Sequence, residues 1–259
     1  MVYFVGAGPG APDLITVRGQ ELLKKADVVI YAGSLVDPRH LRVCKEGCRF
    51  HNSARMTLED VLKVMEEAEG KGLMTVRLHT GDPCLYGAIR EQMDALDAKG
   101  IAYESCPGVS SFCGAAAAMN LEYTLPEVSQ SVIISRVAGR TSVPAKESVR
   151  NLAAHQASMV FFLSAGQLEE LSEELMAGGY PAASPAAIVY RASWPDQKIV
   201  RCNVCDLPWA AEREGITKTA LVIVGDVLDP VYARSRLYDP AFTTGFRQGK
   251  DSGQDERKD

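Results

Sequence analysis

The sequence predicts an α/β protein with two domains. Short runs of Val, Ile and Leu alternate with longer amphipathic stretches from the first residue onward, which is the pattern of strand, helix and strand in turn. The 259 residues, 46% of them hydrophobic, are enough for a substantial core. An irregular stretch at 120–130, which contains Pro126, interrupts the alternation. We therefore expect domains at 1–122 and 123–236, followed by a separate tail at 237–259.

The first region alternates between strand and helix signals. Apolar runs predict strands at 2–5, 27–31 and 73–78. Apolar residues at helical spacing predict helices at 16–26, 88–99 and 110–119. A further helix should begin at Thr57, whose hydroxyl can cap it, and should stop at Gly70. Because strands that alternate with helices form parallel sheets, we expect a mainly parallel first sheet.

The second region has strands that follow one another more closely. The predicted strands are at 131–135, 159–163, 186–190, 198–202 and 220–224. Helices are expected at 146–154 and 167–177. The clustering of strands late in this region favours some antiparallel pairs, and therefore a mixed second sheet. The tail has almost no apolar residues after Phe246, so we expect it to be disordered.

Charge and hydropathy argue against two classes of partner. Lys and Arg total 28 against 33 Asp and Glu, a net charge of -5, so no global positive field attracts nucleic acid. No stretch approaches the ~18 continuous apolar residues of a membrane-spanning helix. The start, MVYFVGAGPG, lacks the basic and long apolar regions of a signal peptide. We therefore expect a cytoplasmic protein that binds neither nucleic acid nor membrane.

The seven cysteines could suggest disulfides or a metal site. Their odd number in a chain expected in the cytosol favours reduced thiols. The spacings Cys44-x3-Cys48 and Cys202-x2-Cys205 resemble zinc-ligand pairs, but neither has a second matched half. We therefore favour small core residues over zinc ligands and predict no metal site in the protein.

The glycine-rich segment at 6–10, GAGPG, follows the first predicted strand, where a dinucleotide-binding loop would lie. Pro9 removes a backbone donor, Pro12 follows, and Ala11 occupies the place of the third glycine. The second strand ends in Tyr-Ala-Gly at 31–33 rather than in an acidic residue. The pattern argues against NAD or FAD, and a nucleotide-dependent oxidoreductase is kept as an alternative.

Four segments in register resemble the tetrapyrrole methylase family. They read GAGPGAPDLIT at 6–16, ADVVIY at 26–31, TGDP at 80–83 and PGVSS at 107–111. MVFFL at 159–163 and TALVIVG at 219–225 extend the resemblance, which runs to about Pro230. It implies two α/β domains with S-adenosylmethionine in the cleft between them, S-adenosylhomocysteine as product, and a homodimer.

Longer segments resemble the family's enzymes that methylate precorrin-4 or cobalt-precorrin-4 at C-11 in cobalamin synthesis. They are YAGSLV at 31–36, VRLHTGDP at 76–83, RVAGRTSVP at 136–144 and VYRASWPDQK at 189–198. The resemblance therefore implies methylation of a tetrapyrrole at that carbon. Alternatives are methylation of precorrin-2, precorrin-3 or uroporphyrinogen III, a diphthine synthase, and a noncatalytic tetrapyrrole carrier. Relatives acting on uroporphyrinogen have an aspartate where this chain has Gly33, so their acid–base mechanism does not transfer.

The resemblance also implies which residues form the site. The cofactor should contact Pro9, Thr80, Gly81, Asp82, Leu85, Ser110, Ser111, Leu163, Ala192 and Ala220. The candidates for a catalytic base are His79 and Asp82. Because the substrate carries carboxylates, cationic side chains near these segments are candidates to bind them. These are Arg18, Arg55, Arg77, Arg136, Arg140 and Arg191.

Overall fold

The computed structural model describes residues 1–233 and 235–249, and it contains two five-stranded sheets. The first sheet has the order β3-β2-β4-β1-β5, and all of its neighbouring strands are parallel. Its strands are β1 (Val2–Gly6), β2 (Val28–Tyr31), β3 (Arg49–Asn52), β4 (Thr75–His79) and β5 (Tyr103–Cys106). The prediction of a mainly parallel first sheet is confirmed.

Helices cover both faces of the first sheet. Helices α2 (Leu58–Glu69) and α3 (Arg90–Ala98) pack on the face that contains Phe4 and Ile30. Helix α1 (Val17–Lys25) and the 3-10 helix η2 (Pro38–Val43) pack on the opposite face. Two further short 3-10 turns, η1 (Pro12–Leu14) and η3 (Ser53–Arg55), lie in the loops after β1 and β3.

The start of α2 has the cap that the sequence predicted. The Thr57 hydroxyl accepts a hydrogen bond from the Asp60 N–H at 3.2 Å, and the Asp60 carboxylate accepts one from the Thr57 N–H at 3.0 Å. This reciprocal pair satisfies two backbone donors that the first turn of a helix leaves unpaired. It fixes the residue at which the helix begins.

The second sheet is mixed, as the clustering of its strands indicated. Its order is β6-β7-β10-β8-β9, with β6 and β7 parallel and the remaining neighbours antiparallel. The strands are β6 (Val132–Ser135), β7 (Ser158–Phe161), β8 (Pro185–Tyr190), β9 (Lys198–Asn203) and β10 (Ala220–Val224). Helices α5 (Val149–Ala153), α6 (Leu168–Ala177) and α7 (Leu207–Glu214) pack on one face. The short 3-10 helices are η4 (Ala145–Glu147), η5 (Val204–Asp206), η6 (Asp226–Leu228) and η7 (Arg236–Tyr238).

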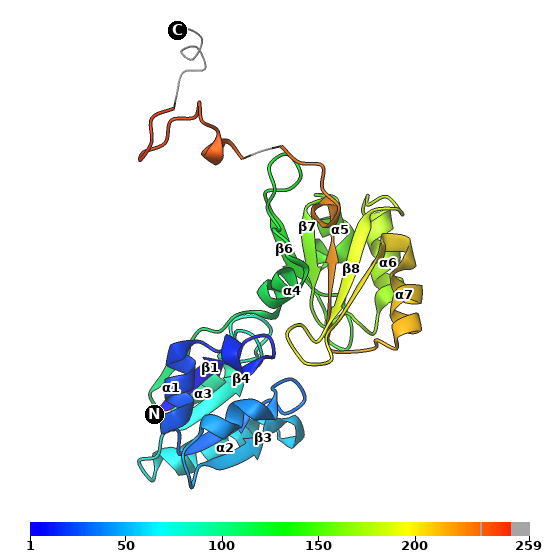
Figure 1. Cartoon of the computed structure of the whole chain (residues 1–259). Helices are drawn as coiled ribbons and strands as arrows, with labels where there is room; N and C mark the ends of the chain where they lie inside the picture. Colours follow the sequence, from blue (N-terminus) through cyan, green and yellow to red (C-terminus); the bar gives the residue numbers. More distant parts are fainter. Residues whose placement is uncertain (234, 250–259) are drawn as a thin grey trace.

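Helix α4 (Ser111–Met119) covers the other face of the second sheet. Its Ala115 and Ala116 belong to a buried cluster with Val160, Ala187 and Ile223. The small side chains let the helix approach the sheet closely. Figure 1 shows α4 between the two lobes of the molecule, close to the end of the first lobe. The helix therefore joins the lobes in space as well as in sequence, and the domain boundary at 122/123 stays a prediction.

The C-terminal tail is described in part. Residues 235–249 include η7, and the Arg247 guanidinium donates hydrogen bonds to the carbonyls of Leu237 and Asp239. The rest of the predicted disordered tail, 250–259, lies outside the described residues, and the expectation of disorder stays a prediction. Among the helices of residues 1–233 and 235–249, none combines the length and apolar character needed to cross a membrane.

Candidate active site

Three glycines bring the carboxyl ends of neighbouring strands together. Gly6 ends β1, Gly81 follows β4 and Gly108 follows β5. A Cβ atom on Gly6 would lie 2.6 Å from the Cα of Gly108 and 2.6 Å from the carbonyl oxygen of Gly81. Gly81 also exchanges backbone hydrogen bonds with Gly8, at 2.8 and 3.2 Å. The loops therefore pack backbone against backbone, at the edge of a parallel sheet where ligands commonly bind.

Asp82 holds two of these loops in place. One carboxylate oxygen accepts a hydrogen bond from the Cys84 N–H at 2.8 Å, and the other accepts one from the Gly108 N–H at 2.9 Å. Partial burial alone would raise the pKa of Asp82, but the hydrogen bonds from Cys84 and Gly108 outweigh it, and the pKa lies below its ordinary value. Asp82 is therefore an ionised structural acceptor, with both oxygens engaged.

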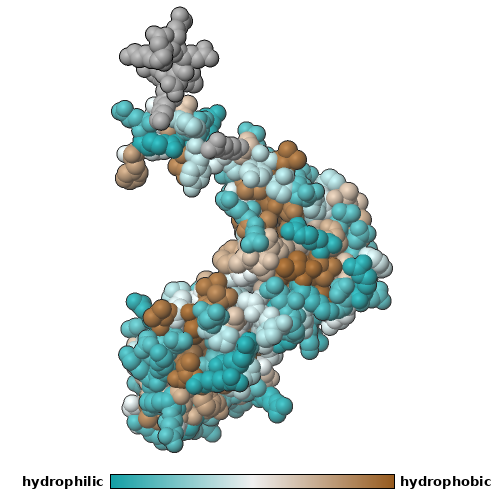
Figure 2. Space-filling view, viewed as in Figure 1, coloured by the Kyte–Doolittle hydropathy of each residue, from teal (hydrophilic) through white to brown (hydrophobic). Residues whose placement is uncertain are grey.

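A cavity of about 570 Å³ lies at this edge, between the two sheets. Its walls come from both halves of the chain: the loops after β1, β4 and β5 face the ends of β7, β8 and β10. Figure 2 shows the molecule narrowing between its two lobes, with apolar residues at the surface beside this waist. The volume is within the range of ~300–1,000 Å³ that is typical of small-molecule sites.

Every residue that the sequence resemblance assigned to the cofactor lines this cavity. The ten are Pro9, Thr80, Gly81, Asp82, Leu85, Ser110, Ser111, Leu163, Ala192 and Ala220. They are spread over more than two hundred positions of the chain, so the fold is what brings them together. Further lining residues that the sequence did not single out include Ser34, Tyr86, Phe162, Trp194 and Leu221.

Unusual backbone conformations surround the cavity. Leu163, Arg191 and Thr219 have positive φ angles of 55°, 46° and 56°. Such conformations are uncommon for residues with a side chain and cluster at ligand-binding sites, where the surrounding structure maintains them. Here Arg191 is held by a hydrogen bond from its N–H to the Thr219 carbonyl at 3.0 Å. The fold therefore holds the backbone of Arg191 in this conformation at the cavity wall.

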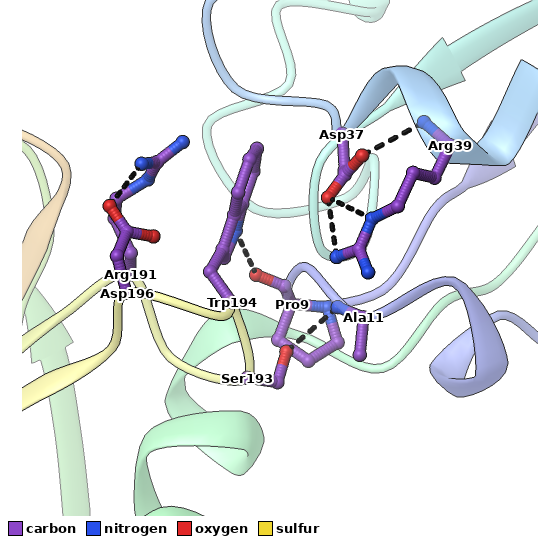
Figure 3. Close-up of polar contacts among 8 residues, drawn as sticks. All are labelled: Pro9, Ala11, Asp37, Arg39, Arg191, Ser193, Trp194 and Asp196. Carbon is purple, nitrogen blue, oxygen red and sulfur yellow. Dashed lines mark hydrogen bonds and ion pairs between the residues drawn. The ribbon is translucent and has the colours of Figure 1, made fainter.

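The loop between β8 and β9 reaches across to the first half of the chain (Figure 3). The indole Nε1 of Trp194 donates a hydrogen bond to the Pro9 carbonyl at 3.2 Å, and the Ala11 N–H donates one to the Ser193 hydroxyl at 2.9 Å. The guanidinium of Arg191 lies 4.0 Å from the centre of the Trp194 ring system and pairs with Asp196. Trp194 lies in the segment at 189–198 that carried the resemblance, but sequence reasoning gave it no role in the site, because a lone tryptophan in a polar loop carries no periodic signal.

The structure does not bring His79 to the cavity. The side chain is 5% exposed and packs beside Phe4 in the core of the first lobe, with 6.2 Å between ring centres. Its Nε2 has no hydrogen-bond partner within the described structure. Burial, with a smaller contribution from the Arg77 charge, lowers the pKa of His79 to about 3. A neutral, enclosed imidazole cannot exchange a proton with a ligand in the cleft.

Arg77 is also a core residue. Its Nε donates a hydrogen bond to the Gln92 side-chain oxygen, and its Nη1 donates one to the Ile30 carbonyl, both at 3.3 Å. Burial lowers the pKa of Arg77 to about 10, which leaves it charged at neutral pH. Gln92 in turn donates to the Ala88 carbonyl at 2.9 Å. The geometry supports a structural link between strands and the 83–89 loop rather than contact with substrate.

The other predicted arginines differ in position. Arg191 lines the main cavity, and Arg136 lines a second cavity of about 290 Å³. The Arg136 guanidinium donates to the carbonyls of Thr141 at 3.1 Å and Ser142 at 2.7 Å, so it also organises its own loop. Arg18, Arg55 and Arg140 are exposed and line neither of these two cavities. The structure thus brings Arg191 alone of the six to the wall of the main cavity.

Tyr86 separates the two cavities. It lines both of them, and its ring lies 5.4 Å from that of Phe162 across the cleft.

All seven cysteines are free thiols, and burial raises the pKa of Cys44 to about 12 and that of Cys202 to about 11. Within the described ranges, no group of three or more His, Cys, Asp or Glu side chains is placed to hold a metal ion.

The parallel sheet, its glycine-lined edge and the cavity between two lobes define a two-domain α/β protein with a small-molecule cleft. A model of the tetrapyrrole (corrin/porphyrin) methylases matches residues 1–208. The chain belongs to the tetrapyrrole methylase family, as the motifs at 6–16, 80–83 and 107–111 indicated.

Individual relatives match almost the whole chain. The chain is 50% identical over 248 residues to the cobalt-precorrin-4 C(11)-methyltransferase of Methanocaldococcus jannaschii, which covers 95% of this chain and 96% of that protein. A solved cobalt-precorrin-4 methyltransferase has a TM-score of 0.86 and 44% identity, over 88% of this chain and 96% of that one. The uroporphyrin-III C-methyltransferase of Thermus thermophilus, complexed with S-adenosylhomocysteine, has a TM-score of 0.73 and 27% identity. The match covers 88% of this chain and 93% of that one.

Proposed function

We propose that the protein is an S-adenosylmethionine-dependent methyltransferase that methylates (cobalt-)precorrin-4 at C-11 in cobalamin biosynthesis. The observation that carries the proposal is that all ten residues assigned to the cofactor by resemblance line one cavity. The named activity of relatives that share 50% and 44% of this sequence supports the choice of substrate.

The cavity fits S-adenosylmethionine in chemistry as well as in volume. Apolar side chains such as Leu85 and Leu221 can pack against adenine, while the backbone groups of 80–82 and the hydroxyls of Ser110 and Ser111 can bind polar atoms. S-adenosylmethionine, when bound, supplies a methyl group whose carbon–sulfur bond breaks, with its electron pair left on sulfur, as a carbon–carbon bond forms at the acceptor. A relative complexed with S-adenosylhomocysteine supports this choice of cofactor.

The protein's contribution is positioning. Tyr86 is 44% exposed and Leu163 66% exposed at the mouth of the cleft, which gives an apolar surface suited to a flat macrocycle. Arg191 pairs with Asp196 through Nη1, and the other N–H groups of its guanidinium can bind a substrate carboxylate at the cavity wall. Holding the reacting atoms in line and excluding water can lower the activation barrier by roughly 7–11 kcal/mol. We do not assign a general base to His79, which is enclosed in the core, or to Asp82, whose oxygens accept from two backbone N–H groups.

We further propose a homodimer in the cytoplasm that acts on a small-molecule tetrapyrrole and binds neither nucleic acid nor membrane. The family resemblance supports the dimer, and the net charge of -5 supports the absence of a nucleic-acid partner. Light scattering after size-exclusion chromatography should give twice the mass of the 28.0 kDa chain. A monomer over the working range of concentration would contradict the dimer.

Transfer of a labelled methyl group tests the activity. The purified protein should convert precorrin-4, cobalt-precorrin-4 or both, and should leave precorrin-2, precorrin-3 and uroporphyrinogen III unmethylated. Transfer only to an earlier intermediate would move the enzyme elsewhere in the family. Calorimetric titration with S-adenosylhomocysteine and with NAD tests the cofactor, because an oxidoreductase would bind only NAD. A carrier would bind S-adenosylhomocysteine and tetrapyrrole without transferring the label.

A further inference from the structure

Hydrogen bonds within the loop between β8 and β9, at 191–197, and one from the Arg191 N–H to the Thr219 carbonyl stabilise the conformation of this loop. Its residues Arg191 and Ser193 have positive φ angles of 46° and 66°. The Trp194 N–H donates a hydrogen bond to the Arg191 carbonyl at 3.0 Å, and the Ser193 N–H donates one to the Gln197 side chain at 2.6 Å. These bonds stabilise one conformation of the loop, in which Ser193 and Trp194 face the first lobe.

This loop contacts the first lobe on both sides of Gly10. Trp194 donates to the carbonyl of Pro9, the residue before Gly10, and Ser193 accepts from the N–H of Ala11, the residue after it (Figure 3). A Cβ atom on Gly10 would lie 2.2 Å from Cδ1 of Trp194. The indole therefore occupies the space that any side chain at position 10 would need.

The contacts of Ser193 and Trp194 with Pro9 and Ala11, here called the clasp, lie at the wall of the main cavity. Pro9, Ala192 and Trp194 all line it, and the first comes from the opposite lobe to the other two. Because the cavity is bounded by both lobes, its shape depends on how the lobes are held relative to one another. We infer that Trp194 is a positioning residue that clasps the two lobes at Pro9–Ala11 and so sets the affinity of the cleft for its cofactor. The identity of that ligand rests on the proposed function.

Binding of S-adenosylhomocysteine to tryptophan variants tests this role. Trp194→Phe removes the donor to Pro9 but keeps an aromatic ring, and it should weaken binding roughly three- to ten-fold. Trp194→Ala removes the ring as well and should weaken binding further. The chain has one other tryptophan, Trp209, which is 59% exposed on α7 and does not line the cavity. Trp209→Phe is therefore the matched control and should bind as the unaltered protein does.

A double-mutant cycle separates the clasp from a general loss of structure. Gly10 does not have a positive φ, so Gly10→Ala meets the indole without requiring a strained backbone. This variant should bind S-adenosylhomocysteine at least about ten-fold more weakly, because the indole must move. A Cβ on Gly10 would also lie 3.0 Å from the Ala192 carbonyl oxygen, a contact that remains in the Trp194→Ala background, so there the same change should weaken binding by a clearly smaller factor rather than by none. Equal losses in both backgrounds would show that Gly10 does not act through Trp194.

Hydrogen exchange gives a readout that needs no ligand. The Ala11 amide donates to Ser193, the residue next to Trp194. Trp194→Ala should therefore speed exchange in a peptide covering 7–11, whereas Trp209→Phe should exchange there at the rate of the unaltered protein. Unchanged exchange, or unchanged S-adenosylhomocysteine affinity in folded Trp194 variants, would overturn the clasp. If the unaltered protein binds no S-adenosylhomocysteine, the proposed function fails, and faster exchange at 7–11 would still support the clasp.

Discussion

The carboxylate of Asp82 accepts a hydrogen bond from the backbone N–H of Gly108 at 2.9 Å, and thereby joins the loop after β4 to the loop after β5. Its second oxygen accepts from Cys84 at 2.8 Å. We expect Asp82→Ala to lower the free energy of unfolding by roughly 1.5–3 kcal/mol, because it leaves two backbone donors without their charged acceptor. Urea unfolding measures the change.

Asp82→Asn is the matched variant for this prediction. It keeps one oxygen acceptor in place, so its loss of stability should be smaller than that of Asp82→Ala. Binding of S-adenosylhomocysteine should weaken in the same order, because the two loops line the cavity. An Asp82→Ala variant with unaltered stability and affinity would show that the loops are held by the glycine contacts alone.

The buried His79 makes stability depend on pH. Its pKa is about 3 in the folded protein, lowered chiefly by burial, whereas an unfolded histidine has a pKa near ~6.5. The unfolded chain therefore binds a proton first as the pH falls, and stability is lost below about pH 6.5. By pH 5 the loss should be roughly 2 kcal/mol. Replacing His79 with Gln removes the group whose protonation favours the unfolded chain, so the variant should lose less free energy of unfolding between pH 7 and 5 than the unaltered protein does.

The pH dependence of methyl transfer tests whether His79 takes part in catalysis. His79 lies in the core rather than at the cleft, so a folded His79→Gln variant should keep the unaltered enzyme's profile of kcat against pH. A lost ionisation in that profile would return His79 to the catalytic machinery. His40 is also buried with a lowered pKa, and its contribution is common to both proteins and cancels in the comparison.

The sequence predicted most of the fold but missed the edge strands of the first sheet and the eight-residue helix α7. Strands β3 and β5 are the two edge strands of the first sheet, and three of four residues in β3 are exposed. An edge strand buries little, so it lacks the apolar run by which β2 or β4 is recognised. The cofactor-lining residues came from resemblance, since backbone contacts leave little side-chain signature. Alternation along β4 places Arg77 and His79 on one face, and both are buried because β4 is an inner strand of a sheet that helices cover on both faces.

Arg191 should matter for substrate and Arg18 should not. Arg191 lines the cavity, while Arg18 is exposed and lines neither cavity described above. We expect Arg191→Met to raise KM for the tetrapyrrole about ten-fold, which corresponds to ~1.4 kcal/mol of lost interaction with a carboxylate. Arg18→Met, the matched control, should leave KM unchanged. Initial rates at fixed cofactor concentration give both values, and equal KM values for the two variants would remove Arg191 from the substrate site.

The packing of glycine loops predicts a large cost at Gly108. A Cβ there would lie 2.3 Å from the Gly81 carbonyl oxygen and 2.7 Å from the Gly6 Cα, and backbone atoms cannot move as a flexible side chain can. Gly108→Ala should therefore lower the free energy of unfolding by about 3 kcal/mol, as overpacking does. At Gly70, where the nearest atom is 3.5 Å away, Ala should be neutral or slightly stabilising. Thermal melts that fall equally for both variants would contradict this account.

Arg77 distinguishes a structural arginine from a substrate-binding one. The residue is 7% exposed, and its guanidinium donates to Gln92 and to the Ile30 carbonyl. Arg77→Met keeps an apolar stem but removes the buried hydrogen bonds to Gln92 and to the Ile30 carbonyl, so we expect a loss of about 2 kcal/mol in stability. KM for the tetrapyrrole should stay within about two-fold of the unaltered enzyme, in contrast to Arg191→Met. A raised KM in a variant with unaltered stability would mean that the guanidinium reaches the substrate when the enzyme is at work.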